Sequence, residues 1–175
     1  MVTKGGDSTM EEQLTIESVQ VGGPKPVIRG GEEQVTSFMK TRTTSSLRLT
    51  SLGLEGDEQA VKEHHGGVYK AVCMYPYVHY AYWQEKTGSV MSFPAFGENV
   101  TVAGLDESTV SIGDVFQWGE AELQVVQPRQ PCQRISFVHQ IKDLTKQVIQ
   151  TGFTGFYLKV LKEGIVSVHH PLRRI

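Results

Sequence analysis

The chain has 175 residues, a net charge of −2 at pH 7 and 39% hydrophobic residues, which are proportions typical of one ordinary globular domain. The slight acidic balance argues against general nucleic-acid binding, because such proteins need a basic excess to displace counterions from the phosphates. No apolar run approaches the ~20 residues of a membrane span. We therefore expect neither a nucleic-acid nor a membrane partner.

Both the beginning of the chain and its cysteines indicate a cytoplasmic protein. Residues 1–13 are polar and lack the apolar core of a signal peptide. The two cysteines, Cys73 and Cys132, form no CxxC motif, which favours a reducing compartment over a disulfide scaffold. We expect residues 1–13 to be a disordered lead and residues 14–175 to form a single domain, because no repeat or linker divides them.

Short alternating runs separated by glycine- and proline-containing turns dominate the first hundred residues. Period-two alternation of apolar and polar residues is typical of strands. The expected strands cover residues 14–21, 26–29, 35–38, 47–49, 70–74 and 100–102. An irregular loop at residues 92–99 precedes the last of them.

One amphipathic helix is predicted at residues 75–86. Pro76 would lie in its first turn, where a missing N–H does no harm, and Gly88 would mark its C-terminal end. Several of its side chains recur at helical spacing and are expected to face the core rather than a ligand. These are Tyr75, Tyr77, Val78, Ala81 and Tyr82, with Trp83 beside them.

The second half of the chain continues the β pattern with one more helix. Strands are predicted at residues 110–112, 115–118, 121–126, 155–161 and 166–168, with a hairpin turn at residues 119–120. A helix is predicted at residues 141–150 and ends at Gly152, whereas residues 132–140 fit no single pattern. The basic tail at residues 172–175 is expected to be a solvated end.

This pattern favours a mainly β fold. Eight or more short strands and only about two helices are typical of a β-barrel or β-sandwich. We predict a single β-rich domain in which a few helices pack on the outside.

A proline-bounded loop at residues 127–132, with the sequence Gln-Pro-Arg-Gln-Pro-Cys, holds the most reactive pair of side chains. Each proline lacks an N–H and has a fixed φ, so the loop is expected to end the preceding strand. A permanent positive charge such as that of Arg129 favours the thiolate of a nearby cysteine, the form that attacks electrophiles and binds soft metals. The alternative is structural, with Cys132 as a small buried hydrophobe and Arg129 as a solvated charge.

A second candidate loop, His-His-Gly-Gly, lies at residues 64–67. Glycines such as Gly66 and Gly67 allow close backbone approach to a ligand and form anion-binding nests. Two adjacent histidines point in different directions on any regular element, so they do not predict a shared metal site. His65 is the candidate for an anion or substrate contact; in the alternative, both histidines shape the loop by hydrogen bonding.

Five motifs in order make the sequence similar to one known family. They are Gly-Leu-Glu-Gly-Asp at residues 53–57, His-His-Gly-Gly at 64–67, Phe-Gly-Glu-Asn at 96–99, Ile-Gly-Asp at 112–114 and the loop at 127–132. This series resembles the MOSC-domain family, named for the C-terminal domain of molybdenum-cofactor sulfurase, and most of all its small bacterial YiiM-like members. The resemblance extends over residues 35–168.

The resemblance implies a MOSC β-barrel that binds the molybdenum cofactor, a molybdenum–pterin (molybdopterin), with Cys132 as the metal ligand and the catalytic residue. It also implies reduction of N-hydroxylated compounds, including hydroxylaminopurine-type base analogues, with electrons from a separate reductase. Pyridoxal phosphate binding and detoxification are further associations of the family.

The residues expected to hold the cofactor are those that match the family motifs or supply donors for a phosphate. They are Lys40, His65, Gly66, Gly67, Asn99 and Arg129. Some members of the family continue into a helical extension. If that extension recruits an electron donor, the partner of this sequence, which stops at Ile175, would differ or dock elsewhere.

Other functions fit the same residues. Cys132 could carry a persulfide and transfer sulfur, since a reactive thiol serves that role as well. The chain could also carry the molybdenum cofactor without catalysis, or be a β-barrel interaction module. Two cysteines cannot ligate a four-thiolate iron–sulfur cluster, and the sequence makes no prediction about the oligomeric state.

Overall fold

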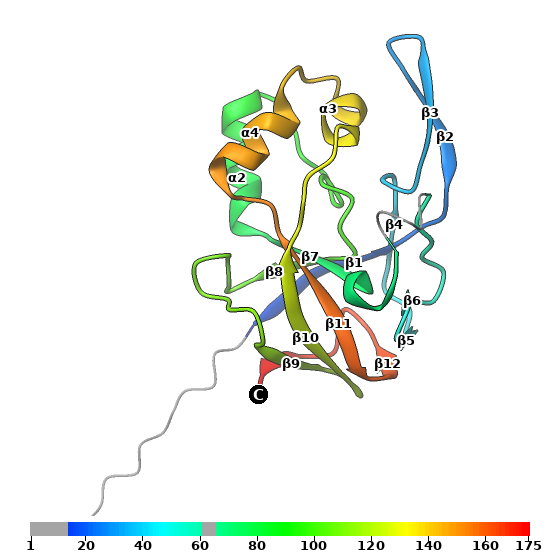
Figure 1. Cartoon of the computed structure of the whole chain (residues 1–175), viewed down its shortest axis with the longest axis vertical. Coiled ribbons are helices and arrows are strands. Elements are labelled where there is room, and N and C mark those ends of the chain that lie inside the picture. The colour runs from blue at the N-terminus through cyan, green and yellow to red at the C-terminus, as the bar shows by residue number, and fades with distance from the viewer. Residues whose placement is uncertain (1–13, 61–65) are drawn as a thin grey trace, which may run out of the picture.

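The computed structural model describes residues 14–60 and 66–175, and in these ranges the chain is mostly sheet, as predicted (Figure 1). The strands are β1 (Thr15–Val21), β2 (Lys25–Arg29), β3 (Glu32–Thr36), β4 (Thr41–Thr43), β5 (Leu47–Thr50), β6 (Gly53–Leu54), β7 (Val72–Pro76), β8 (Val100–Ala103), β9 (Val115–Trp118), β10 (Ala121–Pro128), β11 (Phe156–Lys162), β12 (Gly164–Val166) and β13 (Leu172–Arg174). The helices are the 3-10 helix η1 (Val68–Lys70) and the α-helices α2 (Val78–Thr87), α3 (Arg134–His139) and α4 (Leu144–Thr151).

One curled sheet of eight strands forms the body of the molecule, in the order β13-β9-β10-β11-β7-β8-β1-β4. Neighbouring strands are antiparallel except β7 and β8, which are parallel. An antiparallel bridge between Leu14 and Leu172 brings the start of β1 beside β13. The sheet therefore curls back towards its own edge like a barrel, as the predicted fold class requires.

The alternation of apolar and polar residues along the strands determines which side chains face the barrel core. On β10, Ala121, Leu123 and Val125 are buried and the residues between them are partly exposed, because successive side chains of a strand point to opposite faces. They pack with Phe116 and Trp118 of β9 in the barrel interior.

A second hydrophobic core lies between the sheet and the three α-helices, which gather at one end of the barrel (Figure 1). Tyr75, at the end of β7, stacks on Phe96 with 4.4 Å between the ring centroids. Trp83 of α2, Ile135 of α3 and Leu144 of α4 are buried in the same core. This packing holds the helices against the loop that follows β10.

The predicted helix at residues 75–86 exists but begins later and buries a different face. Pro76 ends β7, and α2 begins at Val78. Its end is as predicted, since Gly88 adopts a left-handed conformation and donates its N–H to the carbonyl of Gln84. The predicted buried stripe is wrong for Tyr77, Val78, Ala81 and Tyr82, which are exposed, whereas His79, Tyr80 and Trp83 are buried. A helix that starts at Val78 turns a different set of residues towards the core.

Three predictions for the second half need correction. Residues 110–112 form no strand, because two turns occupy residues 107–109 and 112–113. β10 continues to Pro128, which pairs with Phe156, so the first proline of the loop does not stop the ladder. The basic tail is not a solvated end, because β13 pairs with β9 and the Ile175 N–H donates to the Val115 carbonyl at 2.9 Å.

The region that fitted no pattern, residues 132–140, contains α3, so the described part of the chain has three α-helices rather than about two. Within residues 14–60 and 66–175, no helix is long and apolar enough to cross a membrane. The remaining predicted strands are present with ends shifted by up to three residues.

Candidate functional site

A pocket with about 590 Å³ of empty space opens beside the loop that follows β10. Four of the residues predicted to bind the cofactor or metal line it: Lys40, Asn99, Arg129 and Cys132. They come from three separate parts of the chain, since Arg129 and Cys132 share the loop after β10, and the curled sheet brings these parts together. The pocket is therefore the candidate functional site.

The loop that holds Cys132 is anchored through its backbone at both ends. At its start, the Arg129 N–H donates to the Gly155 carbonyl at 3.0 Å. At its end, the Cys132 carbonyl accepts from the Ile135 N–H at 3.1 Å and from the Thr145 hydroxyl at 3.1 Å. The thiol of Cys132 is free and half-buried, so it is held in place and remains accessible from the pocket.

Arg129 is a buried cation at this site, with 8% of its surface exposed. Burial by itself lowers the pKa of Arg129, but the neighbouring Cys73, Tyr157 and Cys132 outweigh burial and raise the pKa. The guanidinium therefore stays charged beside both thiols. The structural alternative, in which Arg129 is a solvated charge, is wrong.

Three donors in the pocket wall have no partner within the described part of the chain. They are the Ser37 hydroxyl, Nη1 of Arg129 and Nε of Arg134, and all three atoms are buried. A buried donor without a partner costs free energy, so native proteins almost always satisfy it with protein, water or a ligand. Two guanidinium groups with unused N–H donors are suited to a phosphate or another anion.

Lys40 lines the pocket but already has a partner. Its ammonium forms a buried ion pair with Asp57, which also accepts the Gly22 N–H at 3.1 Å. Arg129 and Arg134 differ from Lys40 in that each has one buried donor without a partner among the described residues. The role of Lys40 in cofactor binding stays a prediction.

Asn99 also uses its side chain within the protein. Its Oδ1 accepts the Cys73 N–H at 3.1 Å, and its Nδ2 donates to the Gln20 carbonyl at 3.4 Å. The amide thereby joins β1 to β7 in the pocket wall. A contact from Asn99 to a ligand remains a prediction.

Of the glycine loop, the structure describes Gly66 and Gly67. Gly67 has a positive φ of 95° and precedes η1, and its carbonyl accepts the Lys70 N–H at 2.9 Å. Neither Gly66 nor Gly67 is in the pocket lining. His65 lies outside the described residues. The assignments to Gly66, Gly67 and His65 stay predictions.

Sequence reasoning did not assign the other lining residues to the site, among them Ser37, Cys73, Arg134 and Tyr157. Cys73 and Tyr157 are direct partners on the neighbouring strands β7 and β11. Burial raises the pKa of the Cys73 thiol, and the charge of Arg129 opposes the increase. Burial likewise raises the pKa of Tyr157 to about 12, so its phenol remains a neutral donor at physiological pH.

Two of these residues had a usable signal, since Ser37 lies in the stretch that leads to Lys40 and Arg134 closely follows Cys132. Every residue of β7 is buried, so no alternation indicates that Cys73 faces a pocket. Nothing near Tyr157 in the sequence indicates a ligand.

Comparisons with known proteins agree with the five motifs. The sequence model of the MOSC domain matches residues 61–173. The chain is 45% identical over 157 residues to the uncharacterized protein YflK of Bacillus subtilis, covering 90% of this chain and 71% of that protein. It is 42% identical over 147 residues to the protein YiiM of Escherichia coli, covering 82% of this chain and 66% of that protein.

A more distant relative is a protein of Gibberella moniliformis named "Reductase", which is 31% identical over 151 residues. The match covers 83% of this chain but 26% of that protein. The chain thus spans a quarter of the fungal relative and about two thirds of the E. coli one.

Solved structures show the same fold. The crystal structure of YiiM from Geobacillus stearothermophilus has a TM-score of 0.75 and 37% identity, covering 93% of this chain and 75% of that one. YiiM from Escherichia coli has a TM-score of 0.74 and 34% identity, covering 93% of this chain and 69% of that one. The chain belongs to the MOSC domain family, as a member similar to the bacterial YiiM proteins.

Proposed function

We propose that this chain binds the molybdenum cofactor in the pocket beside Cys132 and acts as an oxidoreductase that reduces N-hydroxylated compounds. One observation carries the proposal: a free thiol shares a pocket with two arginines, each of which has one buried donor without a partner among the described residues. The family and the relative named "Reductase" support it as well.

The residues present fit the cofactor. A thiolate such as that of Cys132 is a suitable soft ligand for the metal. Nη1 of Arg129 and Nε of Arg134 can donate charge-assisted hydrogen bonds to a phosphate, and the Ser37 hydroxyl can add a third. These are the three buried donors in the lining that lack a partner.

When bound, the cofactor supplies the two-electron chemistry of the reaction. Conversion of an N–OH group to N–H consumes two electrons and two protons and releases water. In this proposal, a separate reductase in the cytoplasm supplies the electrons, and hydroxylaminopurine-type base analogues belong to the substrate class. Cys132 holds the metal, Arg129 and Arg134 neutralise the phosphate, and the Tyr157 phenol is a neutral hydrogen-bond donor in the wall.

The first test is the molybdenum content of protein from a host that makes the cofactor, measured by elemental analysis. Wild type is compared with Cys132→Ala, and with Cys73→Ala as the matched control at the other thiol of the pocket. We expect near-stoichiometric metal in the wild type and the control, and loss of metal in Cys132→Ala with an unchanged Tm. Metal retained in folded Cys132→Ala would exclude this residue as the ligand.

A metal-free wild type, with cofactor synthesis in the host confirmed, would contradict the proposal. It would turn attention to persulfide transfer, which predicts the mass of an additional sulfur atom on Cys132 in protein isolated without reductant. Loaded protein that does not reduce any N-hydroxylated substrate with a chemical electron donor would instead favour the carrier function.

A further inference from the structure

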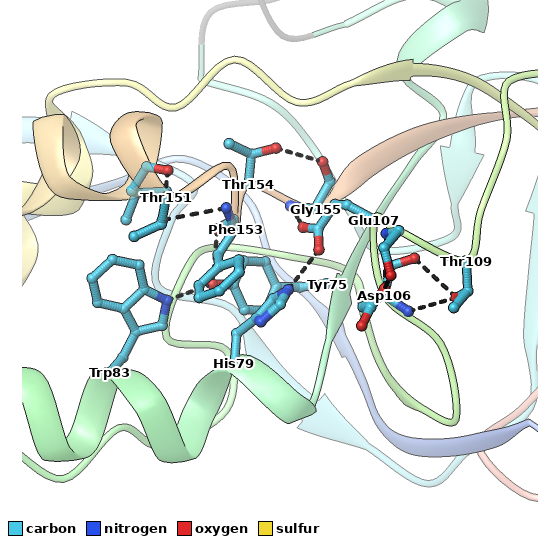
Figure 2. Close-up of polar contacts among 12 residues, drawn as sticks. Tyr75, His79, Trp83, Asp106, Glu107, Thr109, Thr151, Phe153, Thr154 and Gly155 are labelled. Carbon is cyan, nitrogen blue, oxygen red and sulfur yellow. Dashed lines mark hydrogen bonds and ion pairs between the residues drawn. The ribbon is translucent and has the colours of Figure 1, made fainter.

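A second polar network lies next to the pocket, between α2 and the start of β11 (Figure 2). Its centre is Glu107, whose two carboxylate oxygens have different partners. Oε2 is hydrogen-bonded to Nε2 of His79 at 2.5 Å, and Oε1 accepts the Gly155 N–H at 2.7 Å. Glu107 is not in the pocket lining, so its contacts are with the protein rather than with a bound ligand.

The segment that leads to Gly155 is held on several sides, as Figure 2 shows. The Phe153 ring stacks on the His79 ring with 3.9 Å between the centroids. The Phe153 carbonyl accepts the Tyr75 hydroxyl at 3.0 Å, and Tyr75 in turn accepts the Trp83 indole N–H at 2.8 Å. The network therefore fixes the link between α4 and β11 against α2 and β7.

Gly155 transmits this position to the pocket. Its carbonyl accepts the Arg129 N–H at 3.0 Å, while its own N–H is bound by Glu107. Gly155 has a φ of 71°, and a Cβ atom there would lie 2.4 Å from the Met74 carbonyl oxygen. The peptide is thus packed tightly against β7 and leaves the Arg129 backbone little freedom.

We propose that Glu107 is a positioning residue of the pocket. Oriented by His79, it fixes the Gly155 peptide, and Gly155 then sets where the Arg129 guanidinium stands relative to Cys132. The inference rests on the proposed function, in which Arg129 binds the anionic part of the cofactor. It assigns to Glu107 a role that acts through another residue, without contact to the ligand.

The test uses the reactivity of Cys132 in the cofactor-free full-length protein. A Cys73→Ala background leaves Cys132 as the one cysteine of the chain. The alkylation rate of Cys132 is measured with iodoacetate, which is an anion, and with iodoacetamide, which is neutral. The ratio is the rate with iodoacetate divided by the rate with iodoacetamide. Both reagents react with the thiolate, so changes in the thiolate fraction cancel and the ratio reports the local positive charge.

Arg129→Met is the reference variant. A unit charge at about 4 Å in water changes such a ratio about fivefold, so we expect a decrease of that order. Glu107→Ala is expected to decrease the ratio about two- to fivefold, up to the full effect of one charge, because Arg129 loses its fixed position. Removal of the negative charge of Glu107 would by itself increase the ratio. The direction of the change therefore distinguishes a loss of Arg129 positioning from the direct effect of the lost charge.

Three further variants test the interpretation of this result. Glu107→Gln keeps an oxygen that can accept the Gly155 N–H but removes the negative charge, so its ratio is expected to stay at or above the wild-type value rather than to decrease. Leu172→Ala removes a buried side chain of the barrel core and is expected to lower Tm without changing the ratio. His79→Leu removes the partner that orients Glu107, and is expected to decrease the ratio by a smaller factor. It provides the test if Glu107→Ala does not fold.

The outcomes distinguish the two proposals. If Arg129→Met leaves the ratio unchanged, Arg129 does not act on Cys132, and the pocket assignment that underlies the proposed function fails. If Arg129→Met decreases the ratio while Glu107→Ala or, in its place, His79→Leu leaves it unchanged or increases it, the positioning role of Glu107 is overturned and the proposed function stands.

Discussion

Lys40 and Asp57 form a buried ion pair in the wall of the pocket, with 6% and 2% of their side chains exposed. Asp57 also accepts the Gly22 N–H at 3.1 Å. The pair joins the loop after β3 to the turn after β6 and neutralises one cation of the pocket. Arg129 and Arg134, by contrast, each keep a buried donor without a partner among the described residues, and these donors are available to an anion.

We expect Asp57→Ala to decrease the free energy of unfolding by about 3–5 kcal/mol, because it leaves the Lys40 ammonium buried and unpaired. The double variant Lys40→Met, Asp57→Leu is expected to recover most of this loss, since an apolar pair avoids the desolvation of both charges. Urea denaturation gives the values. The exposed pair Arg48–Glu163 is the control, where Glu163→Ala is expected to cost about 0–1 kcal/mol. An equally small cost for Asp57→Ala would contradict the prediction.

Arg129→Met is expected to affect metal content and stability in opposite directions. Its Nη1 is buried without a partner, so an apolar side chain of similar length relieves a desolvation cost. We expect the free energy of unfolding of the cofactor-free protein to increase by about 1 kcal/mol, whereas elemental analysis shows loss of molybdenum. Parallel loss of stability and metal would instead indicate that Arg129 holds the fold together.

Tyr157 is expected to contribute to the loss of stability at alkaline pH. Burial raises its pKa to about 12 from a model-compound value of 10.0. Below pH 10 both states are protonated. Between pH 10 and 12 the unfolded state loses this proton first, so the free energy of unfolding falls by up to about 1.4 kcal/mol per pH unit.

Tyr157→Phe removes this contribution, so its stability should fall less steeply between pH 10 and 12. Urea denaturation at pH 8, 10, 11 and 12 measures the difference, with each variant compared with its own value at pH 8. Burial also raises the pKa values of Tyr75 and Tyr80, which leaves a residual slope of the same sign in Tyr157→Phe. Identical slopes for wild type and Tyr157→Phe would contradict a raised pKa at this residue.

Gly155→Ala is expected to be far more damaging than Gly152→Ala, although both glycines have a positive φ, 71° and 74°. Alanine at Gly152 meets nothing within 4 Å and costs about 1 kcal/mol for the left-handed conformation. The Cβ atom of alanine at Gly155 also lies 2.4 Å from the Met74 carbonyl oxygen. We therefore expect the free energy of unfolding to decrease by a further amount of about 2 kcal/mol or more, at the upper end of what local backbone strain costs. Thermal unfolding compares the two, and equal Tm values would show that β7 moves away easily.

Local patterns in the sequence predicted elements where neighbouring residues decide the structure. The hairpin at residues 115–126 is present because its alternation and Gly119 are sufficient to form it. The predicted helix start at Tyr75, with Pro76 in the first turn, was wrong, because both residues belong to β7, which lies between β11 and β8. Tertiary pairing overrode a local preference at this position.

The candidate site divides in the same way. The loop at residues 127–132, with Arg129 close to Cys132, was evident from the sequence because prolines restrict φ wherever they occur. That Cys73 and Tyr157 belong to the candidate site was not evident, because it depends on β7 lying beside β11. A strand that is buried on both faces has no alternation from which its neighbours could be inferred.

The sequence alone was sufficient to predict the β-rich class, the family and the loop that holds Cys132, since each depends on patterns among residues close together in the chain. The ion pair of Lys40 with Asp57, the free donors of Arg129 and Arg134, and the bond from Glu107 to Gly155 were decided by the tertiary structure. The physical reason is that a buried charge or donor is satisfied by whichever partner the folded chain places next to it. That partner is selected by the pairing of distant strands, which local periodicity does not specify.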